Sequence, residues 1–568
     1  MSKKNTFMNN VLIILFSQVA VKVLGLVYRM VITNISGFGD AGNGYYNTGF
    51  QVYTLLLAIS SVGIPNAISK MTSERAALGD WKGAHKIFKT AMVLFFVIGL
   101  VCAAILFFGA DFIVGTILGQ AEADGAKYVL KALAPSVIFV CMSAVIRGYF
   151  TGMSNMKATS MSQVLEQVFK CVFTVGIVWV MAGFSIYANA EVKAYSLAAG
   201  ANFASTIATV LSFIYLIYFY NKNKRGIWQH VQNSTGETVN LPFGKMCKSI
   251  LVISIPISLG GIISAINRIV DTATITRGIE LAFAAAIPAH GNVAEIINPT
   301  LKQLNEEAVR LSGILSKSDT LLNLPIAMNI AFATVLVPAI AGALAVGNKK
   351  EASEKISYSF LISILIIFPC AVGYIVMAQP IYKLLYPNAM LGSDLLQISS
   401  IALIFIALNQ TISGSLQGIG KIFVPATGLL MGCIAKFILN VVLIRQPSIN
   451  IYGAPISSIV CQVISFSYGF TVLCKQTSVK LGFGKYIAKP LTAAIVMGAC
   501  AVGVYKLAMY ACHINIISLF AAIAAAAVVY LLTVLKLNIL SADEIEQLPA
   551  GGMILKKLQG LGFYKDEM

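Results

Sequence analysis

The sequence predicts an all-α polytopic membrane protein with about fourteen transmembrane helices. Of the 568 residues, 58% are hydrophobic and 11% are charged, and the mean hydropathy is +0.81. This composition is typical of multi-pass membrane proteins and excludes an ordinary soluble enzyme. Apolar runs that reach the roughly 20 residues needed to cross a bilayer recur along the whole chain.

Polar breaks divide the chain into membrane-length segments. They lie near residues 9–35, 44–70, 87–118, 128–153, 157–184, 192–220, 247–275, 319–347, 356–385, 391–418, 422–445, 451–474, 487–511 and 515–536. With the N-terminus in the cytoplasm, the inward loops and tails hold roughly 25 Lys and Arg and the outward ones about 9, a positive-inside bias. We therefore expect both termini in the cytoplasm. Because the net charge of +18 belongs largely to these loops, we expect no nucleic-acid partner.

A weak internal repeat indicates two related six-helix halves. Gly148 and Gly152 match Gly414 and Gly418 at an offset of roughly 270 residues. The stretch 298–317 has apolar residues at helical spacing and is expected on the membrane surface. The predicted parts are an N-lobe (1–220), a cytoplasmic linker (221–246), a C-lobe (247–475) with an external segment (276–318), a helix pair (476–540) and a cytoplasmic amphipathic tail (541–568).

The first apolar run carries two cations and no acid. Lys22 and Arg29 lie about two helical turns apart, so they share nearly one face of a helix. An unpaired cation at the centre of a membrane helix costs at least ~2.5–3.5 kcal/mol. Arg147 and Lys436 also lie inside predicted spans without an acid one turn away. We therefore expect these cations to face an anionic ligand or a watery cavity.

Two further cations have an acid on their own helix. Lys170 follows Glu166 by four residues, and Arg268 precedes Asp271 by three. Either pair could neutralise itself locally. The alternative left open is that the cations bind substrate and that Glu166 and Asp271 couple transport to an ion.

Phosphate is the expected ligand of such a set. Guanidinium forks bind phosphate oxygens in pairs, and ammonium groups add point charge. The candidate substrate-binding residues are therefore Lys22, Arg29, Arg147, Lys170, Arg268 and Lys436. Four histidines without an HExxH spacing and ten scattered cysteines predict neither a metal site nor a disulfide framework. We expect no catalytic residue and no cofactor, with the membrane potential, Na⁺ or H⁺ as the energy source.

Several stretches carry a family resemblance. They are SQVAVKVLGLVYRM in the first helix, ISGFGDAGNGYYNTGFQVYTLLLAISSVGIPNAISK after it, TLLNLPIAMN and GSLQGIGK. With them the chain resembles the polysaccharide-exporter branch of the MOP superfamily. Within that branch it is similar to the SpoVB/YtgP group, relatives of the lipid II flippase MurJ.

The resemblance implies two six-helix lobes packed as a V, an additional helix pair and a central cationic cavity. It also implies outward movement of an undecaprenyl-diphosphate-linked sugar by alternating access. MurJ-like proteins carry an R-x-L-G-x-x-R pattern in the first helix. Here Lys22 replaces the first arginine and Arg29 is displaced by one residue. The arginine of the second helix is absent, since Leu57 or Ala58 stands there.

The expected function is a flippase of the bacterial cytoplasmic membrane. Lipid II is the first candidate substrate, and the expected partners are a lipid-linked oligosaccharide and membrane lipids around a monomer. A MATE-type cation-coupled drug antiporter and an exporter of another lipid-linked polysaccharide are the alternatives. A membrane glycosyltransferase or ligase would need acids near the outer surface, and the external segment offers Glu280, Glu295, Glu306 and Glu307. A scaffold role also stays open.

Overall fold

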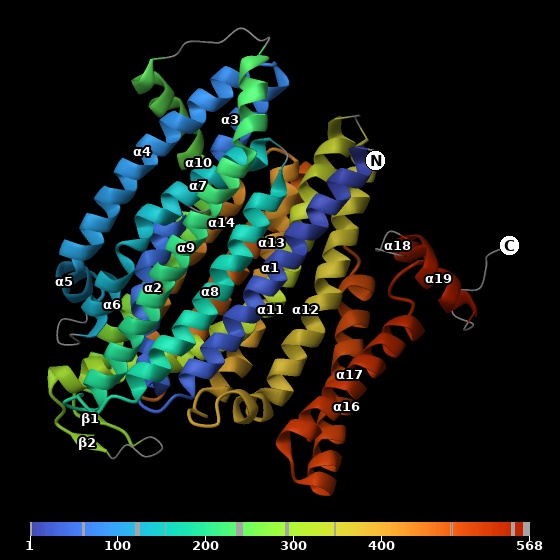
Figure 1. The fold of residues 1–568 in the computed structure, drawn as a ribbon. Coiled ribbons are helices and arrows are strands. Elements are labelled where there is room, and N and C mark those ends of the chain that lie inside the picture. Colours follow the sequence, from blue (N-terminus) through green and yellow to red (C-terminus); the bar gives the residue numbers. More distant parts are fainter. Residues whose placement is uncertain are drawn as a thin grey trace. The chain divides into compact units, whose positions relative to one another are not determined.

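Long helices make up most of the chain, as the apolar runs predict. The computed structural model describes residues 3–58, 63–119, 125–153, 155–234, 242–289, 295–345, 348–477, 479, 481–546 and 551–560. Among these residues, ten helices are long and apolar enough to cross a membrane, or eleven if α10, bent by 52° after Ile255, is included. The all-α polytopic fold is therefore confirmed (Figure 1).

Each predicted segment overlaps a helix. The first half contains α1 Lys3–Thr33, α2 Gly39–Ala58, α3 Ile64–Ala77, α4 Trp81–Phe108, α5 Ala110–Phe112, α6 Gly125–Leu133, α7 Ser136–Gly152, α8 Met156–Ala182 and α9 Ala190–Gln232. The second contains α10 Phe243–Ala282, α11 Leu301–Ala345, α12 Lys349–Leu385, α13 Ser393–Gly418, α14 Phe423–Leu443, α15 Gly453–Gln476, α16 Lys489–Cys512, α17 Asn515–Lys536, α18 Ala542–Glu546 and α19 Gly551–Gly560. Strands β1 Ala286–Ile287 and β2 Ile296–Ile297 pair antiparallel between α10 and α11.

Short polar side chains begin several of these helices. Asp80 accepts a hydrogen bond from the Gly83 amide at the start of α4, and Asn189 does the same for Val192 at the start of α9. These caps satisfy amides that have no partner inside the helix.

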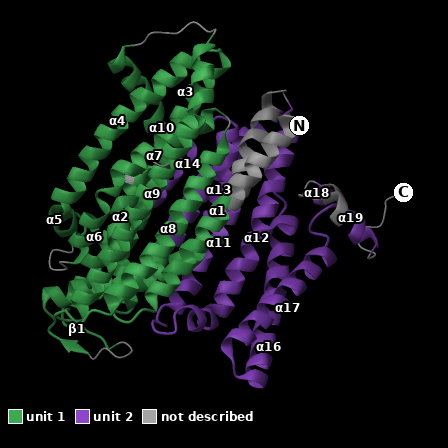
Figure 2. Ribbon diagram, viewed as in Figure 1, with its two compact units in different colours: residues 1–324, 433–457 green, residues 325–432, 458–568 purple. Residues whose placement is uncertain are grey.

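The chain forms two compact units (Figure 2). Unit 1 contains residues 1–324 and 433–457, and unit 2 contains residues 325–432 and 458–568. In unit 1, α8 packs against α1 and α9, while α10 packs against α2 and α3. In unit 2, α16 and α17 pack against each other and against α12. The lobe boundaries taken from the sequence stay a prediction.

Two glycines allow α2 and α11 to come very close within unit 1. A Cβ at Gly44 would lie 1.9 Å from the carbonyl oxygen of Val309. A Cβ at Gly313 would lie 1.9 Å from the carbonyl oxygen of Asp40. Small residues at crossing points let helix backbones approach closely, as is common in membrane proteins. This close crossing fixes the polar N-terminal half of α11 against α2.

Two predicted connections contain long helical stretches. Residues 221–232 of the predicted linker belong to α9, because polar residues mark the end of the apolar run without breaking the helix. Most of the stretch 298–317 is helical as expected, but it forms the first part of α11, which runs without a break from Leu301 to Ala345. Its place on the membrane surface stays a prediction. The predicted tail contains α18 and α19, while its residues 547–550 and 561–568 lie outside the described residues.

Candidate functional site

All six candidate cations lie in unit 1, and four of them are linked to one another by charge interactions or by a shared tyrosine. α1 supplies Lys22 and Arg29, α8 supplies Lys170, and α10 supplies Arg268. The charges of Arg268 and Lys170 both act on Lys22. The side chains of Lys22 and Arg268 are exposed, and that of Lys170 is half-buried. We call these four residues the cation cluster.

Arg29 is the buried member of the cation cluster. Its side chain is 6% exposed, and its guanidinium carbon lies 4.2 Å from the centroid of the Tyr46 ring. Its Nη2 donates a weak hydrogen bond to Ser316 Oγ at 3.4 Å, while its Nε is buried without a partner in the described part of the chain. No carboxylate among the described residues forms a salt bridge with Arg29. The positive charge is therefore buried without a direct counter-ion.

Lys170 is surrounded by aromatic rings. Its Nζ lies 4.7 Å from the ring centroid of Phe50, 5.5 Å from that of Tyr28 and 5.9 Å from that of Tyr46. The hydroxyls of Tyr28 and Tyr46 lie 3.0 Å apart and share a hydrogen bond. Ring faces attract a cation without adding negative charge. Lys170 and Arg29 are thus connected through one tyrosine.

Asp319 is an acid that acts on two members of the cation cluster. It lies in α11 with an exposed side chain, and the charges acting on it are those of Asp271, Lys436, Arg268 and Arg29. Asp319 and Asp271 together oppose five cations, the cation cluster and Lys436, which leaves an excess of positive charge. Like charges held close together repel one another, and an anion placed among them relieves that repulsion.

The other two candidate cations are paired. Arg147 donates from Nη2 to Glu166 Oε2 at 2.7 Å and from Nε to Ser162 Oγ at 2.9 Å. Lys436 is 2% exposed, and its Nζ lies 2.5 Å from Asp271 Oδ2. These pairs join α7 to α8 and α14 to α10 within unit 1.

Glu166 and Asp271 therefore do not pair with the cations one turn away on their own helices. Instead, each carboxylate lies at hydrogen-bond distance from a cation on a facing helix, the Arg147 guanidinium for Glu166 and the Lys436 ammonium group for Asp271. Asn440 Nδ2 donates to Asp271 Oδ1 at 3.0 Å, and Thr209 Oγ1 lies 3.5 Å from Glu166 Oε1. Lys170 and Arg268 are consequently left without these acids, which places them in the cation cluster. The substrate and ion-coupling roles stay predictions.

Three of the four acids considered for an enzyme site, Glu280, Glu306 and Glu307, have side-chain partners. Glu307 accepts two hydrogen bonds of 2.7 Å from Arg310, and Glu280 accepts one of 3.1 Å from Asn305. Lys302 lies between two carboxylates, 3.3 Å from Glu191 and 3.7 Å from Glu306. Burial raises the pKa of Glu306 to about 7, and the hydrogen bond and charge of Glu191 add to that shift.

Sequence reasoning missed the aromatic residues and Asp319. Tyr46 and Phe50 lie one turn apart in α2, a spacing that equally describes an ordinary core stripe. Asp319 stands at the polar edge of a predicted span, where an acid is unremarkable. The signal that could have identified them is the position of Tyr46 and Phe50 on α2, because this helix directly follows α1, which carries cations but no acid.

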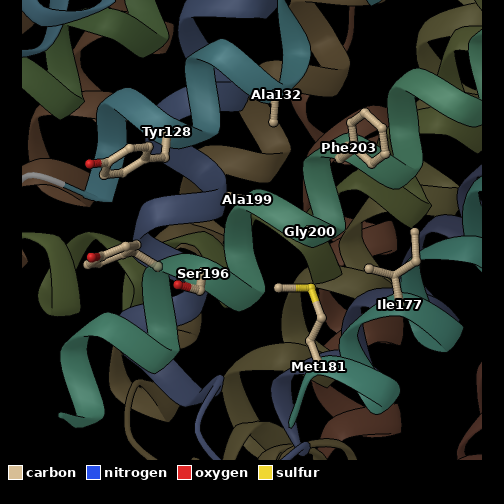
Figure 3. Close-up of a pocket in the computed structure, with 9 residues that line it drawn as sticks. Tyr128, Ala132, Ile177, Met181, Ser196, Ala199, Gly200 and Phe203 are labelled. Atoms are coloured by element: carbon tan, nitrogen blue, oxygen red, sulfur yellow. The ribbon is translucent and has the colours of Figure 1, made fainter. Parts of the chain in front are cut away.

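A surface cavity of about 500 Å³ lies elsewhere in unit 1 (Figure 3). It is lined by α6, α8 and α9, with Tyr128, Met181 and Phe203 around it. None of its lining residues is charged or belongs to the predicted site. Among the described residues no group of three or more His, Cys, Asp or Glu could hold a metal ion.

Comparison with known proteins identifies relatives across nearly the whole chain. Residues 7–344 match the family model "Polysaccharide biosynthesis protein", and residues 293–522 match "Lipid II flippase MurJ". Lipid II flippase MurJ of Bacillus subtilis (strain 168) is 25% identical over 80% of this chain and 79% of its own. Stage V sporulation protein B of the same organism is 23% identical over 97% of this chain and 99% of its own.

Solved structures show the same fold at lower identity. A lipid II flippase MurJ structure in an inward closed conformation has a TM-score of 0.64 at 14% identity, covering 91% of this chain and 97% of its own. An inward-facing MATE multidrug transporter of the MOP superfamily has a TM-score of 0.62 at 15% identity, covering 81% and 98%. At these identities the likeness concerns the fold alone.

Proposed function

Because the chain belongs to the polysaccharide biosynthesis protein family, we propose that it is a flippase for an undecaprenyl-diphosphate-linked sugar precursor. It would carry this lipid from the inner to the outer leaflet of the bacterial cytoplasmic membrane by alternating access. Lipid II is the first candidate substrate, since a MurJ model matches residues 293–522 and MurJ is among the relatives. Both termini would be cytoplasmic, and the protein would act as a monomer.

The cation cluster is the observation that carries the proposal. Arg29 and Lys170 have aromatic partners in place of carboxylates, and Lys22 and Arg268 are exposed in the same electrostatic environment. A diphosphate needs several donors and more than one positive charge. The exposed cations would meet the diphosphate first, and the Arg29 fork would bind oxygens that approach the buried side.

The charges also indicate how transport would be driven. Binding and release of an anion require no covalent step at these residues. A carrier with excess positive charge is biased by the membrane potential, by about 2.3 kcal/mol per charge per 100 mV. Glu166 and Asp271 would bind Na⁺ or H⁺ only if they released their present partners, Arg147 and Lys436.

A MATE-type antiporter is the second candidate, favoured by the fold likeness to MATE transporters. Such a protein would depend on a carboxylate that binds the coupling ion. Loss of transport in Asp271→Asn together with full activity in Lys22→Ala would favour the antiporter. The opposite pattern is expected for the flippase.

Complementation of a strain depleted of its lipid II flippase tests the proposed function. Wild type, Lys22→Ala and Arg29→Ala are compared at matched membrane levels, with Lys506→Ala as the control. Lys506 is an exposed lysine of α16, and that helix contributes nothing to the cation cluster. We expect rescue by wild type and by the control, and loss in both cluster variants. Failure of a well-expressed wild type would contradict lipid II transport, and rescue by all four would contradict the site.

A further inference from the structure

Buried cations in this protein have two kinds of partner. Lys436 and Arg147 lie against carboxylates at 2.5 and 2.7 Å, whereas Arg29 lies against the ring of Tyr46. A carboxylate neutralises the cation that it stabilises. A ring attracts the cation through its quadrupole and leaves the charge in place.

Tyr46 occupies a central position among the cations. Its ring centroid lies 4.2 Å from the Arg29 guanidinium and 5.9 Å from Lys170 Nζ, so a single side chain of α2 reaches cations from both α1 and α8. Its hydroxyl is held by Tyr28 at 3.0 Å and also interacts with the Lys170 ammonium group, and the whole residue is 1% exposed. The ring is therefore fixed in place by its surroundings.

We infer that Tyr46 is a positioning residue, whose ring holds Arg29 and Lys170 as an un-neutralised pair ready for the diphosphate. This role rests on the proposed function, because it assigns an anion to these two cations. Without the ring, the 3.4 Å hydrogen bond to Ser316 would be the remaining side-chain hydrogen bond of Arg29 within the described part of the chain. A guanidinium held so weakly would sample other orientations. Fixing it in the orientation that binds the diphosphate would then cost part of the binding free energy.

Binding of a defined anionic lipid tests this role. The purified full-length protein is placed in lipid nanodiscs and titrated with undecaprenyl diphosphate, with undecaprenyl monophosphate as the comparison lipid. Tyr46→Leu removes the ring, and Tyr46→Phe keeps the ring but removes the hydroxyl. Phe95→Leu is the control for loss of a buried ring, because Phe95 is 1% exposed and lies in α4, which supplies no residue to the cation cluster.

We expect Tyr46→Leu to weaken diphosphate binding about tenfold, as loss of a desolvated cation–π contact implies. Tyr46→Phe should weaken binding clearly less than Tyr46→Leu, because it loses the hydroxyl interaction with Lys170 but keeps the ring against Arg29. Phe95→Leu should bind like wild type. Equal weakening in Tyr46→Phe and Tyr46→Leu, or in Phe95→Leu, would overturn the role of the ring.

A double-mutant cycle separates positioning from general damage. If Tyr46 acts through Arg29, Tyr46→Leu should cost clearly less in an Arg29→Ala background than in the wild type. A full tenfold loss in both backgrounds would contradict the inference. Phe50→Leu gives an independent variant if Tyr46→Leu does not fold, because the Phe50 ring contacts Lys170 at 4.7 Å and should weaken binding through that cation. Unchanged binding in Phe50→Leu would count against cation–π positioning.

The outcomes distinguish the two levels of the hypothesis. Wild-type protein that binds neither lipid, or binds both equally, would contradict the proposed diphosphate site itself. Wild-type protein that prefers the diphosphate, with Tyr46→Leu unchanged, would leave the flippase standing and overturn the positioning role alone.

Discussion

The buried ion pair between Asp40 and Lys317 provides a quantitative test of the packing of α2 against α11. Lys317 Nζ lies 2.5 Å from Asp40 Oδ1, and the two side chains are 0% and 11% exposed. Asp40→Ala would leave a buried ammonium without its counter-charge, which costs about 3–5 kcal/mol. The charge of Arg310 also acts on Lys317 and, being of the same sign, adds to the cost.

The assay is thermal unfolding of the purified protein in detergent. Asp40→Ala should lower the apparent Tm by several degrees. Asp40→Ala/Lys317→Met should recover most of that loss, because an apolar replacement of a buried pair is often neutral. Lys70→Ala is the control, since its pair with Glu74 is 3.9 Å long and about 60% exposed on both sides, and should change stability by at most about 0.5 kcal/mol. An Asp40→Ala protein as stable as the control would refute the reasoning, and so would a double variant as unstable as Asp40→Ala.

Three further variants test other contacts. Gly44→Ala should destabilise the protein strongly, because its Cβ would lie 1.9 Å from a carbonyl oxygen of α11. Gly176→Ala, which has open space around it, is the control and should not be destabilising. Equal Tm values for these two variants would contradict the close crossing of α2 and α11. The pKa of Glu306, raised to about 7, means that the folded state holds this proton more tightly than the unfolded one. The stability of the wild type should therefore fall relative to that of Glu306→Gln as the pH rises from about 5 to 8. Parallel pH profiles of stability for the two proteins would count against the raised pKa of Glu306. Arg147→Ala should lower the free energy of unfolding by about 2 kcal/mol, because Glu166 loses its guanidinium partner. In denaturant unfolding, the double variant Arg147→Ala/Glu166→Ala should recover part of that stability. Strictly additive effects of the two substitutions would argue against the ion pair.

The helical architecture and the family could be predicted because they depend on local features. The apolar runs match the helices, since a membrane span must satisfy its own backbone hydrogen bonds. The first-helix stretch from Lys22 to Arg29 and the motifs after it indicated the superfamily, and the family match over residues 7–344 confirms that resemblance. The helical spacing of 298–317 was recognisable, but its continuity with the following apolar run was not, because polar residues at the junction do not break α11.

The cation partners could not be predicted because they depend on contacts between distant helices. Glu166 is one turn from Lys170, yet it pairs with Arg147 on α7. Asp271 is one turn from Arg268, yet it pairs with Lys436 on α14. Helical spacing says which residues share a face, but not which face a neighbouring helix covers. The division of six similar cations into a paired group and a cation cluster needed the structure.

Translocation in proteoliposomes tests the central claim most directly. The full-length protein is reconstituted with a fluorescent lipid II, and the rate at which the headgroup reaches the opposite leaflet is measured for wild type, Arg268→Ala and the control Lys506→Ala. We expect wild type and the control to exceed protein-free vesicles, with Arg268→Ala at least about tenfold slower, as loss of one charge-assisted phosphate contact implies. A wild-type rate equal to that of protein-free vesicles would contradict lipid II transport, and an unchanged Arg268→Ala rate would contradict the cation cluster as its binding site.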